Sequence, residues 1–211
     1  MIRMVLIGLL AAAAARAGEM DAAGRAAFPS NGVDEAPRRG TFAEAGAGAF
    51  ATLGGSRRVS AVQPYLGLTV GRDLGSAASL FASVGTGASS GSCFQTADQG
   101  CAATDSFGAT FVEAGASYGT WMSRRLLLSG RVVGGVTLFS PGPFTRDAAV
   151  PDRSIAPHAG AGLGVEYDTR LSHFALGLDA MVRYSLVARP DSGGRQGIAS
   201  LALMPRVRYV F

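Results

Sequence analysis

The side chains with the greatest capacity for chemistry in this chain are two histidines and a scattered set of acids and arginines. Ser172 and His173 are adjacent and could supply a nucleophile and a general base. Adjacent side chains point to opposite sides of a strand, however, so this pair could not hydrogen-bond catalytically. The sequence also places no acid pair beside His158. We therefore expect no enzyme activity and no catalytic residues, with both histidines as polar side chains of an interior.

Acids and arginines alternate with apolar residues along several extended segments. Four acids and four arginines share one face of these segments: Glu44, Glu113, Arg131, Glu166, Asp179, Arg183, Arg206 and Arg208. An unpaired charge in a low-dielectric interior is costly, so we expect these side chains to pair. A turn centred near Met122 would place Glu113 directly opposite Arg131. The set could form a charge-paired plug or a gated ion path, and a barrel only wide enough for its own side chains favours the plug.

The elements that must position these charges are strands. Eight segments of alternating polarity follow one another, at approximately 41–52, 61–71, 77–88, 106–119, 125–139, 154–168, 172–187 and 197–211. Most exceed the roughly 9–11 residues that a tilted strand needs to cross a bilayer. Long and short connections alternate, as a barrel with both termini on one side requires. The pattern predicts an all-β, eight-stranded antiparallel up-and-down transmembrane β-barrel with a packed polar lumen.

The last segment shows which face is which. Val207, Tyr209 and Phe211 share one face, and Arg206 and Arg208 share the other. Apolar side chains toward lipid and charged ones toward a lumen explain this arrangement. A soluble β-sandwich or lipocalin would also alternate, but with its large apolar side chains inward. Aromatic residues at the predicted periplasmic strand ends would form one interfacial girdle, comprising Tyr118, Trp121, Tyr167, Phe174, Tyr209 and Phe211.

With its terminal aromatic strand, the region 41–211 resembles the small eight-stranded outer-membrane barrels, such as the OmpA transmembrane domain and OmpX. The resemblance rests most specifically on Val207, Tyr209 and Phe211 as a C-terminal assembly signal. It implies outer-membrane lipid and the barrel-assembly machinery as partners. More faintly, 106–118 and 131–139 resemble small outer-membrane proteins of adventurous gliding motility, of the CglE type. That similarity implies a protein partner in an envelope or motility assembly.

The N-terminus agrees with export to the outer membrane of a Gram-negative bacterium. Residues 1–17 have the pattern of a signal peptide, with cleavage near Ala17, and 18–40 form an irregular periplasmic segment before the barrel at 41–211. The formal net charge is +4, and every basic residue is arginine. This charge is accompanied by no basic helix or aromatic-basic platform, so we expect no nucleic-acid partner.

Two predicted loops carry the remaining signals. Cys93 and Cys101 lie in the loop 89–105, and an isolated pair in an exported protein predicts a local disulfide. No further Cys or His lies nearby, so we expect no metal and no cofactor. This loop also contains Phe94, and the loop between the fifth and sixth segments contains Phe144. We expect these loops to bind the partner. The alternative is that the protein itself is a lipid-modifying barrel enzyme or a small ion channel.

Overall fold

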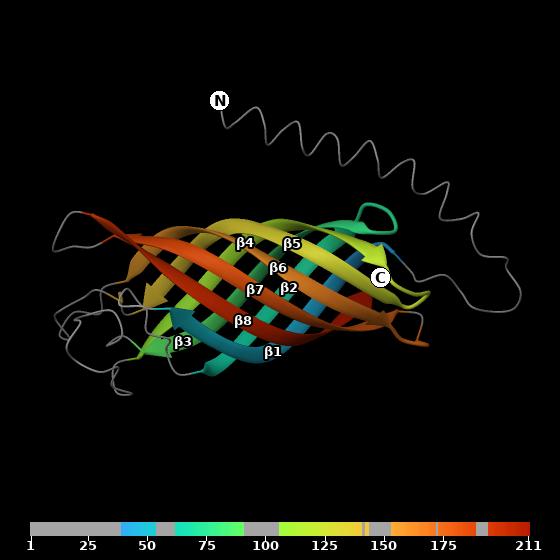
Figure 1. The fold of residues 1–211 in the computed structure, drawn as a ribbon, viewed down its shortest axis with the longest axis horizontal. Coiled ribbons are helices and arrows are strands. Elements are labelled where there is room, and N and C mark those ends of the chain that lie inside the picture. Colours follow the sequence, from blue (N-terminus) through green and yellow to red (C-terminus); the bar gives the residue numbers. More distant parts are fainter. Residues whose placement is uncertain are drawn as a thin grey trace, which may run out of the picture.

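The computed structural model describes residues 39–53, 62–90, 106–140, 142–143, 153–171, 173–188 and 194–211. Within these ranges the chain forms eight strands (Figure 1): β1 (Thr41–Leu53), β2 (Gln63–Asp73), β3 (Ala78–Ser90), β4 (Ser106–Trp121), β5 (Leu126–Ser140), β6 (Ser154–Asp168), β7 (Phe174–Ala188) and β8 (Arg195–Val210). No helix among the described residues has the length and apolar character needed to cross a membrane.

The strands form one closed antiparallel barrel. Each strand pairs with its neighbours in sequence, and β1 pairs with β8 to close the ring. The short connections after β2, β4 and β6 lie at the same end as Phe211, and we call this the turn end. The opposite end, where the longer connections lie, is the loop end. This topology confirms the predicted eight-stranded up-and-down barrel. Closure satisfies the backbone hydrogen bonds that an open sheet would leave unpaired at its edges.

The barrel is apolar outside and mixed inside. Leu68 and Leu163 point outward and are each 66% exposed, whereas Phe111 points inward and is 1% exposed. The same alternation runs along β8, where Leu201, Leu203 and Val207 face out. A soluble β-sandwich would bury its large apolar side chains. Because such side chains face outward here, the described residues do not form a soluble sandwich.

The register of the β4–β5 hairpin differs from the prediction. Glu113 pairs with Gly135, and Arg131 pairs with Ser117. The expected pairing of Glu113 with Arg131 is therefore wrong. Trp121 pairs with Leu127, so the turn is centred two residues later than Met122. Moving the centre of a hairpin by two residues moves each cross-strand partner by four, so Glu113 lies opposite Gly135 and not Arg131.

Glycines on the inner face make room for large side chains. A Cβ added at Gly85 would overlap the Tyr65 hydroxyl, and one at Gly177 would meet the Arg206 guanidinium. Gly75 has a different role, because its φ of 125° in the β2–β3 turn is a conformation that side chains rarely allow. The high glycine content thus reflects a narrow barrel packed with its own residues.

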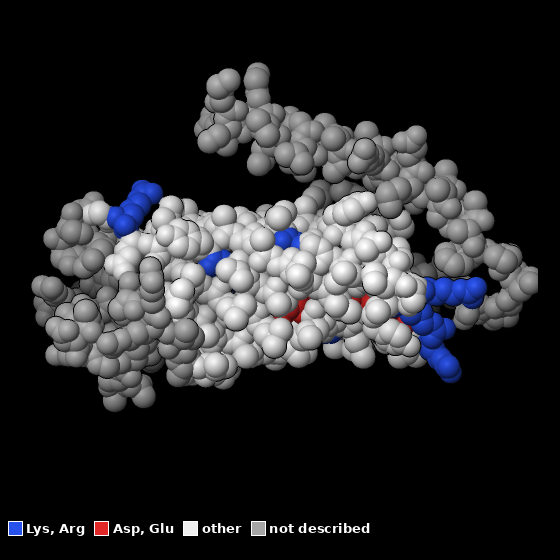
Figure 2. Space-filling view, in the orientation of Figure 1, with Lys and Arg blue, Asp and Glu red and all other residues white. Residues whose placement is uncertain are grey.

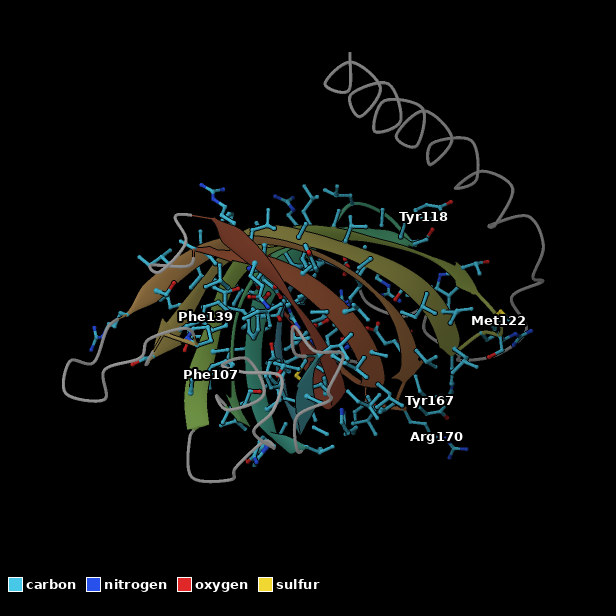
Figure 3. The ribbon with its side chains drawn as sticks, turned by 60° about the vertical axis from the view of Figure 1, so that its left-hand side comes forward. Phe107, Tyr118, Met122, Phe139, Tyr167 and Arg170 are labelled. Carbon is cyan, nitrogen blue, oxygen red and sulfur yellow. The ribbon has the colours of Figure 1, made fainter. Side chains whose placement is uncertain are left out.

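Most of the predicted aromatic girdle lies on the outer face of the turn end. Tyr118 and Tyr167 lie at this end, far from Phe107 and Phe139 (Figure 3), and Phe174, Tyr209 and Phe211 form successive ring contacts there. Trp121 is the exception: it follows the inward-facing parity of Glu113 and Gly119 in β4. Its indole N–H donates to the Ser76 carbonyl oxygen at 3.0 Å. The prediction that Trp121 joins the girdle is wrong, because the strand extends to this residue with its parity unchanged.

Candidate functional site

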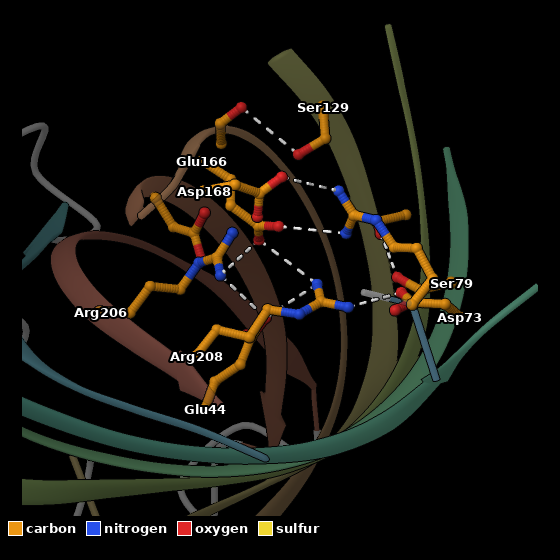
Figure 4. A network of polar contacts seen from close by, with 12 residues as sticks. Glu44, Asp73, Ser79, Ser129, Glu166, Asp168, Arg206 and Arg208 are labelled. Carbon is orange, nitrogen blue, oxygen red and sulfur yellow. Dashed lines mark hydrogen bonds and ion pairs between the residues drawn. The ribbon is translucent and has the colours of Figure 1, made fainter. Parts of the chain in front are cut away.

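The most elaborate site in the described residues is an ion-pair network in the turn-end half of the lumen (Figure 4). Arg206 lies at its centre and is 3% exposed. Its Nη1 lies 2.9 Å from both Glu44 Oε1 and Glu166 Oε2, and its Nε lies 2.9 Å from Asp179 Oδ2. One guanidinium thus joins carboxylates from β1, β6 and β7, and fixes those strands relative to β8.

Two further arginines extend this network. Arg131 from β5 reaches Glu44 at 3.2 Å and Asp179 at 3.1 Å. Arg208 lies 3.3 Å from Glu166 and also binds Asp73 at the end of β2. Its guanidinium lies 3.7 Å from the centre of the Phe42 ring, so the charge also has an aromatic face as neighbour. Every strand except β3 and β4 therefore supplies a charged group to this network.

Glu113 and Arg183 form a separate pair near the middle of the lumen. Arg183 binds both carboxylate oxygens, with Nη2 at 2.7 Å from Oε1 and Nε at 2.8 Å from Oε2. Ser83 donates a further hydrogen bond to Glu113 at 2.9 Å. The guanidinium also lies 4.8 Å from the centre of the Phe111 ring. Bidentate geometry and a satisfied carboxylate are what a buried ion pair requires.

A chain of hydrogen bonds beside this pair has the order of a catalytic triad. Thr137 Oγ1 lies 3.0 Å from His158 Nδ1, and His158 Nε2 lies 3.1 Å from Glu113 Oε2. Both Thr137 and the His158 side chain are completely buried. Thr137 also bonds Ser185 at 3.0 Å. With the hydroxyl enclosed in this way, the arrangement crosslinks β4, β5, β6 and β7 without presenting a nucleophile to a substrate.

The loop-end half of the lumen has the opposite chemistry. Its core consists of buried apolar and aromatic side chains: Phe50, Tyr65, Phe107, Ala109, Phe111, Phe139, Ala156, Val187, Ile198 and Ala202. The Phe50 ring lies 5.8 Å from the rings of both Tyr65 and Phe111. Ion pairs therefore dominate the turn end and centre of the lumen, and aromatic and aliphatic side chains dominate the loop end. A smaller apolar cluster packs beside the charged network: Phe42, Phe81, Val133, Met181 and Val210. Phe50, Tyr65 and Phe111 stand at strand positions whose side chains point inward by alternation. This sequence pattern could have predicted an aromatic core at the loop end.

Two small cavities lie between these side chains. One cavity of about 10 Å³ adjoins Arg131, Arg206 and Arg208, and another of about 20 Å³ lies among Tyr65, Glu113 and Met181. A space of this size holds about one water molecule. Among the described residues, no group of three or more His, Cys, Asp or Glu side chains is arranged to hold a metal ion.

Arg39 covers the lumen at the turn end. This residue precedes β1, and its Nη1 lies 3.2 Å from Glu166 Oε1 while its Nη2 lies 3.6 Å from Asp168 Oδ2. Its guanidinium also lies 4.8 Å from the centre of the Trp121 ring. The next backbone N–H, that of Gly40, donates to Asp73 at 3.2 Å. Arg39 and Gly40 are thus held at the mouth of the charged network.

The structure places the predicted residues as follows. All eight expected lumen charges are buried and engaged in ion pairs. Arg39, Asp73 and Asp168 belong to the same network but were not predicted to do so. Arg39 lay in the expected N-terminal segment 18–40, Asp73 lay beyond the expected strand 61–71, and Asp168 was the last residue of the expected strand 154–168. His158 lies in the lumen, whereas His173 stacks on outward-facing Tyr209 with ring centres 5.5 Å apart, so its predicted lumen position is wrong.

The predicted sites in the long loops have no structural description. Cys93, Cys101, Phe94 and Phe144 lie outside the described residues, as do the signal peptide and 18–38. Val207, Tyr209 and Phe211 are described, and their side chains point outward at the turn end.

The fold is similar to solved outer-membrane barrels. Neisserial surface protein A (NspA) matches with a TM-score of 0.59 and 14% identity, over 81% of this chain and 97% of that one. Ail, the attachment invasion locus protein of Yersinia pestis, matches with a TM-score of 0.49 and 13% identity, over 82% of this chain and 100% of that one. A major outer membrane protein from Thermus thermophilus gives 0.45 and 14%, over 81% and 99%. No protein-family model matches the chain, and no curated protein matches its sequence.

These observations define the class of the protein. Its chain has the fold of the small eight-stranded outer-membrane β-barrels, with an apolar outer wall and a lumen filled by its own side chains.

Proposed function

We propose that this protein is a closed, non-enzymatic outer-membrane barrel that holds recognition loops at the cell surface. The observation that carries the proposal is the filled lumen: ion pairs occupy the turn-end half, and packed aromatic side chains occupy the loop-end half. Such an interior leaves the loops as the surfaces on which a solute or partner could be recognised. Rigid scaffolds with variable loops are a common way to build a binding protein.

The outer wall supports membrane insertion in this proposal. Exposed leucine and valine side chains run along the strands between the two ends, and the aromatic girdle marks the turn-end interface. The turn end, where the described part of the chain begins at Arg39 and ends at Phe211, would then face the periplasm after signal-peptide cleavage near Ala17. The outward position of Val207, Tyr209 and Phe211 supports recognition of the last strand by the barrel-assembly machinery.

The absence of enzyme activity is part of the proposal. In the described residues the strongest candidate constellation is Thr137, His158 and Glu113, and burial of its hydroxyl supports a structural role. Lipid substrates would need a nucleophile on the outer wall or at a rim. An unchanged lipid A profile in a deletion strain is the expected result.

The loops 89–105 and 140–153 supply the binding surface in this proposal. Phe94 and Phe144 offer apolar contact, and a disulfide between Cys93 and Cys101 would limit the freedom of the longer loop. The faint sequence resemblance to gliding-motility proteins favours a protein partner in an envelope or motility assembly. That assignment rests on sequence alone.

The test replaces residues 91–105 by a tight turn. We expect the variant to keep its heat-modifiable mobility on gels and its place in the outer membrane, and to lose partner binding or the associated phenotype. The matched control keeps the loop length and both cysteines, with the other residues scrambled, and should lose binding equally. A folded and fully functional short-loop variant would contradict the loop proposal. Stable single-channel conductance of the wild type in planar bilayers would contradict the closed lumen.

A further inference from the structure

Three prolines lie within the strands of the described residues: Pro64 in β2, Pro157 in β6 and Pro205 in β8. Proline has no backbone N–H, so each removes one hydrogen bond from the neighbouring strand that its nitrogen faces. Pro64 and Pro157 do so at the loop end, where the β2–β3 and β6–β7 pairings begin only at the next residue. Pro205 is different, because β8 pairs with both of its neighbours on either side of this residue.

The nitrogen of Pro205 faces β1. At the end of β8, the Phe211 N–H donates to the Thr41 carbonyl oxygen in β1 at 2.9 Å. The preceding N–H, that of Val210, donates to His173 on the β7 side at 2.8 Å. Successive N–H groups of an antiparallel strand alternate between its two neighbours. Pro205 and Phe211 are separated by an even number of positions, so both face β1.

The missing donor interrupts the seam that closes the barrel. The β1–β8 pairing runs from Phe42 to Gly46, stops, and resumes at Ala49 in the same register. In that register Ala47 lies opposite Pro205, so its carbonyl oxygen receives no backbone hydrogen bond from that residue. A wall within a membrane offers no water to replace such a bond, and the seam is therefore weakened here.

The interruption is bounded by contacts on both sides. Toward the turn end, Glu44 of β1 forms an ion pair with Arg206 of β8 at 2.9 Å. Toward the loop end, Phe50 and Ala202 belong to one buried apolar cluster. The two strands run side by side (Figure 1), and the wall that contains them carries few charged side chains between its ends (Figure 2). Separation of β1 from β8 is thus limited to a short, lipid-facing stretch.

The side chain behind the interruption is Met204. It lies against two inward-facing glycines: a Cβ added at Gly46 would lie 2.7 Å from its Cγ, and one at Gly67 would lie 2.9 Å from its Sδ. Met204 also lines the cavity of about 20 Å³ that adjoins Tyr65. Methionine is unbranched and apolar, so it can change rotamer without leaving a charge unpaired. The lumen thus has a movable apolar side chain where its wall lacks a hydrogen bond.

We propose that the β1–β8 seam opens laterally between Gly46 and Ala49 and exposes Met204, with the cavity beside it, to the acyl chains of the membrane. This inference rests on the membrane position proposed above. The opening leads from the lumen to lipid and not from one aqueous side to the other, so the barrel remains closed along its axis. The seam acts as a lateral gate, and Pro205 is the residue that keeps it weak.

The test measures which residues meet lipid. The full protein is inserted into phosphatidylcholine nanodiscs that contain a phospholipid with a diazirine on its acyl chain, irradiated, and analysed by tandem mass spectrometry. We expect strong labelling of Leu203, which faces outward. Met204 should be labelled at several times the level of Met181, an inward-facing methionine of β7 whose pairings with β6 and β8 are uninterrupted.

Two proline variants test the cause of the opening. P205A supplies the missing N–H and should lower the labelling of Met204 about fivefold, the effect of one added backbone hydrogen bond on an opening equilibrium. The matched control P157A supplies an N–H at the loop end, beyond the last pair of β6 with β7, and should leave the labelling of Met204 unchanged.

Three results would overturn the inference: equal labelling of Met204 and Met181 in the wild type, unchanged labelling of Met204 in P205A, and an equal loss of labelling in P157A. The first needs no variant, so it decides the question even if P205A fails to insert. Leu203 reports the membrane position separately. Label on Leu203 without label on Met204 would contradict the gate alone, whereas absence of label from Leu203 would contradict both proposals.

Discussion

The two halves of the lumen fill a barrel of one width with different chemistry. At the turn end, Arg206 alone contacts three carboxylates from three other strands. At the loop end, Phe50, Tyr65 and Phe111 pack ring against ring. The charged half gains directional contacts between particular strands, while the aromatic half gains burial that tolerates small shifts in position. The comparison teaches that the same inward parity can be used to fix register or to fill volume.

The boundary between the halves is shared by both kinds of side chain. Arg183 binds Glu113 with two hydrogen bonds and also packs against the rings of Phe111 and Tyr65. A guanidinium can serve both neighbours because its edges donate hydrogen bonds while its face is weakly hydrated. The change from charged to apolar interior therefore occurs at the Glu113–Arg183 pair, whose guanidinium contacts both kinds of neighbour.

The largest effect is expected from breaking the charged half at its centre. Arg206→Ala leaves Glu44, Glu166 and Asp179 without their common partner in a buried site. Removal of one member of a buried ion pair typically costs 3–5 kcal/mol, so we expect a loss of about 5 kcal/mol or failure to assemble. Urea unfolding in lipid vesicles measures it. The exposed Arg195→Ala is the control, and an equal small effect of both changes would mean that the network does not stabilise the barrel.

The aromatic half should be somewhat less sensitive. Phe111→Ala removes a fully buried ring and leaves a cavity beside Phe50 and Tyr65, with an expected cost of about 3–4 kcal/mol. Phe111→Leu keeps most of the volume and should recover more than half of this loss. The same unfolding assay measures both variants. If Phe111→Ala is neutral, the loop-end cluster is not a packed core and the contrast between the halves fails.

The boundary can be tested with a double-mutant cycle. Glu113→Gln and Arg183→Gln should each destabilise the barrel, and the double variant should cost less than their sum by about 2 kcal/mol, since the two side chains form one bidentate pair. The cycle of Glu113 with Arg131 should give a clearly smaller coupling, because Arg131 pairs with Glu44 and Asp179 instead. Stronger coupling of Glu113 with Arg131 would restore the register that the sequence suggested.

The smallest effect is expected at the mouth. Arg39→Ala removes contacts with Glu166, Asp168 and Trp121, but its side chain is partly exposed and water can replace some of them. We expect a loss of about 0.5–1 kcal/mol, diminished at high salt. Trp121 is the single tryptophan of the chain, and acrylamide should quench its fluorescence more strongly in the variant. Unchanged quenching would mean that Arg39 does not cover the ring.

Several properties were determined by the sequence alone. The eight expected strands lie within about two residues of β1 to β8, and the inward face of the eight lumen charges was assigned correctly from alternation. Both follow from local physics, because side chains change sides at every residue of a strand and polarity tells which side meets lipid. The same alternation also predicts that Phe50 and Phe111 face inward.

The tertiary structure decided which residues meet. Glu113 binds Arg183 from a strand 70 residues away, and Glu44 binds Arg206 across 162 residues, because barrel closure and strand stagger bring those positions together. The turn after Trp121 has no feature that fixes its centre in the sequence, so the register of that hairpin could not be predicted. Arg39 and His173 lie just outside the strands, where local alternation no longer specifies direction. Trp121 follows the alternation of β4, which extends two residues beyond its expected end at 119. Partner choice in a closed barrel is a global property, because one shift of register changes every pair along a strand.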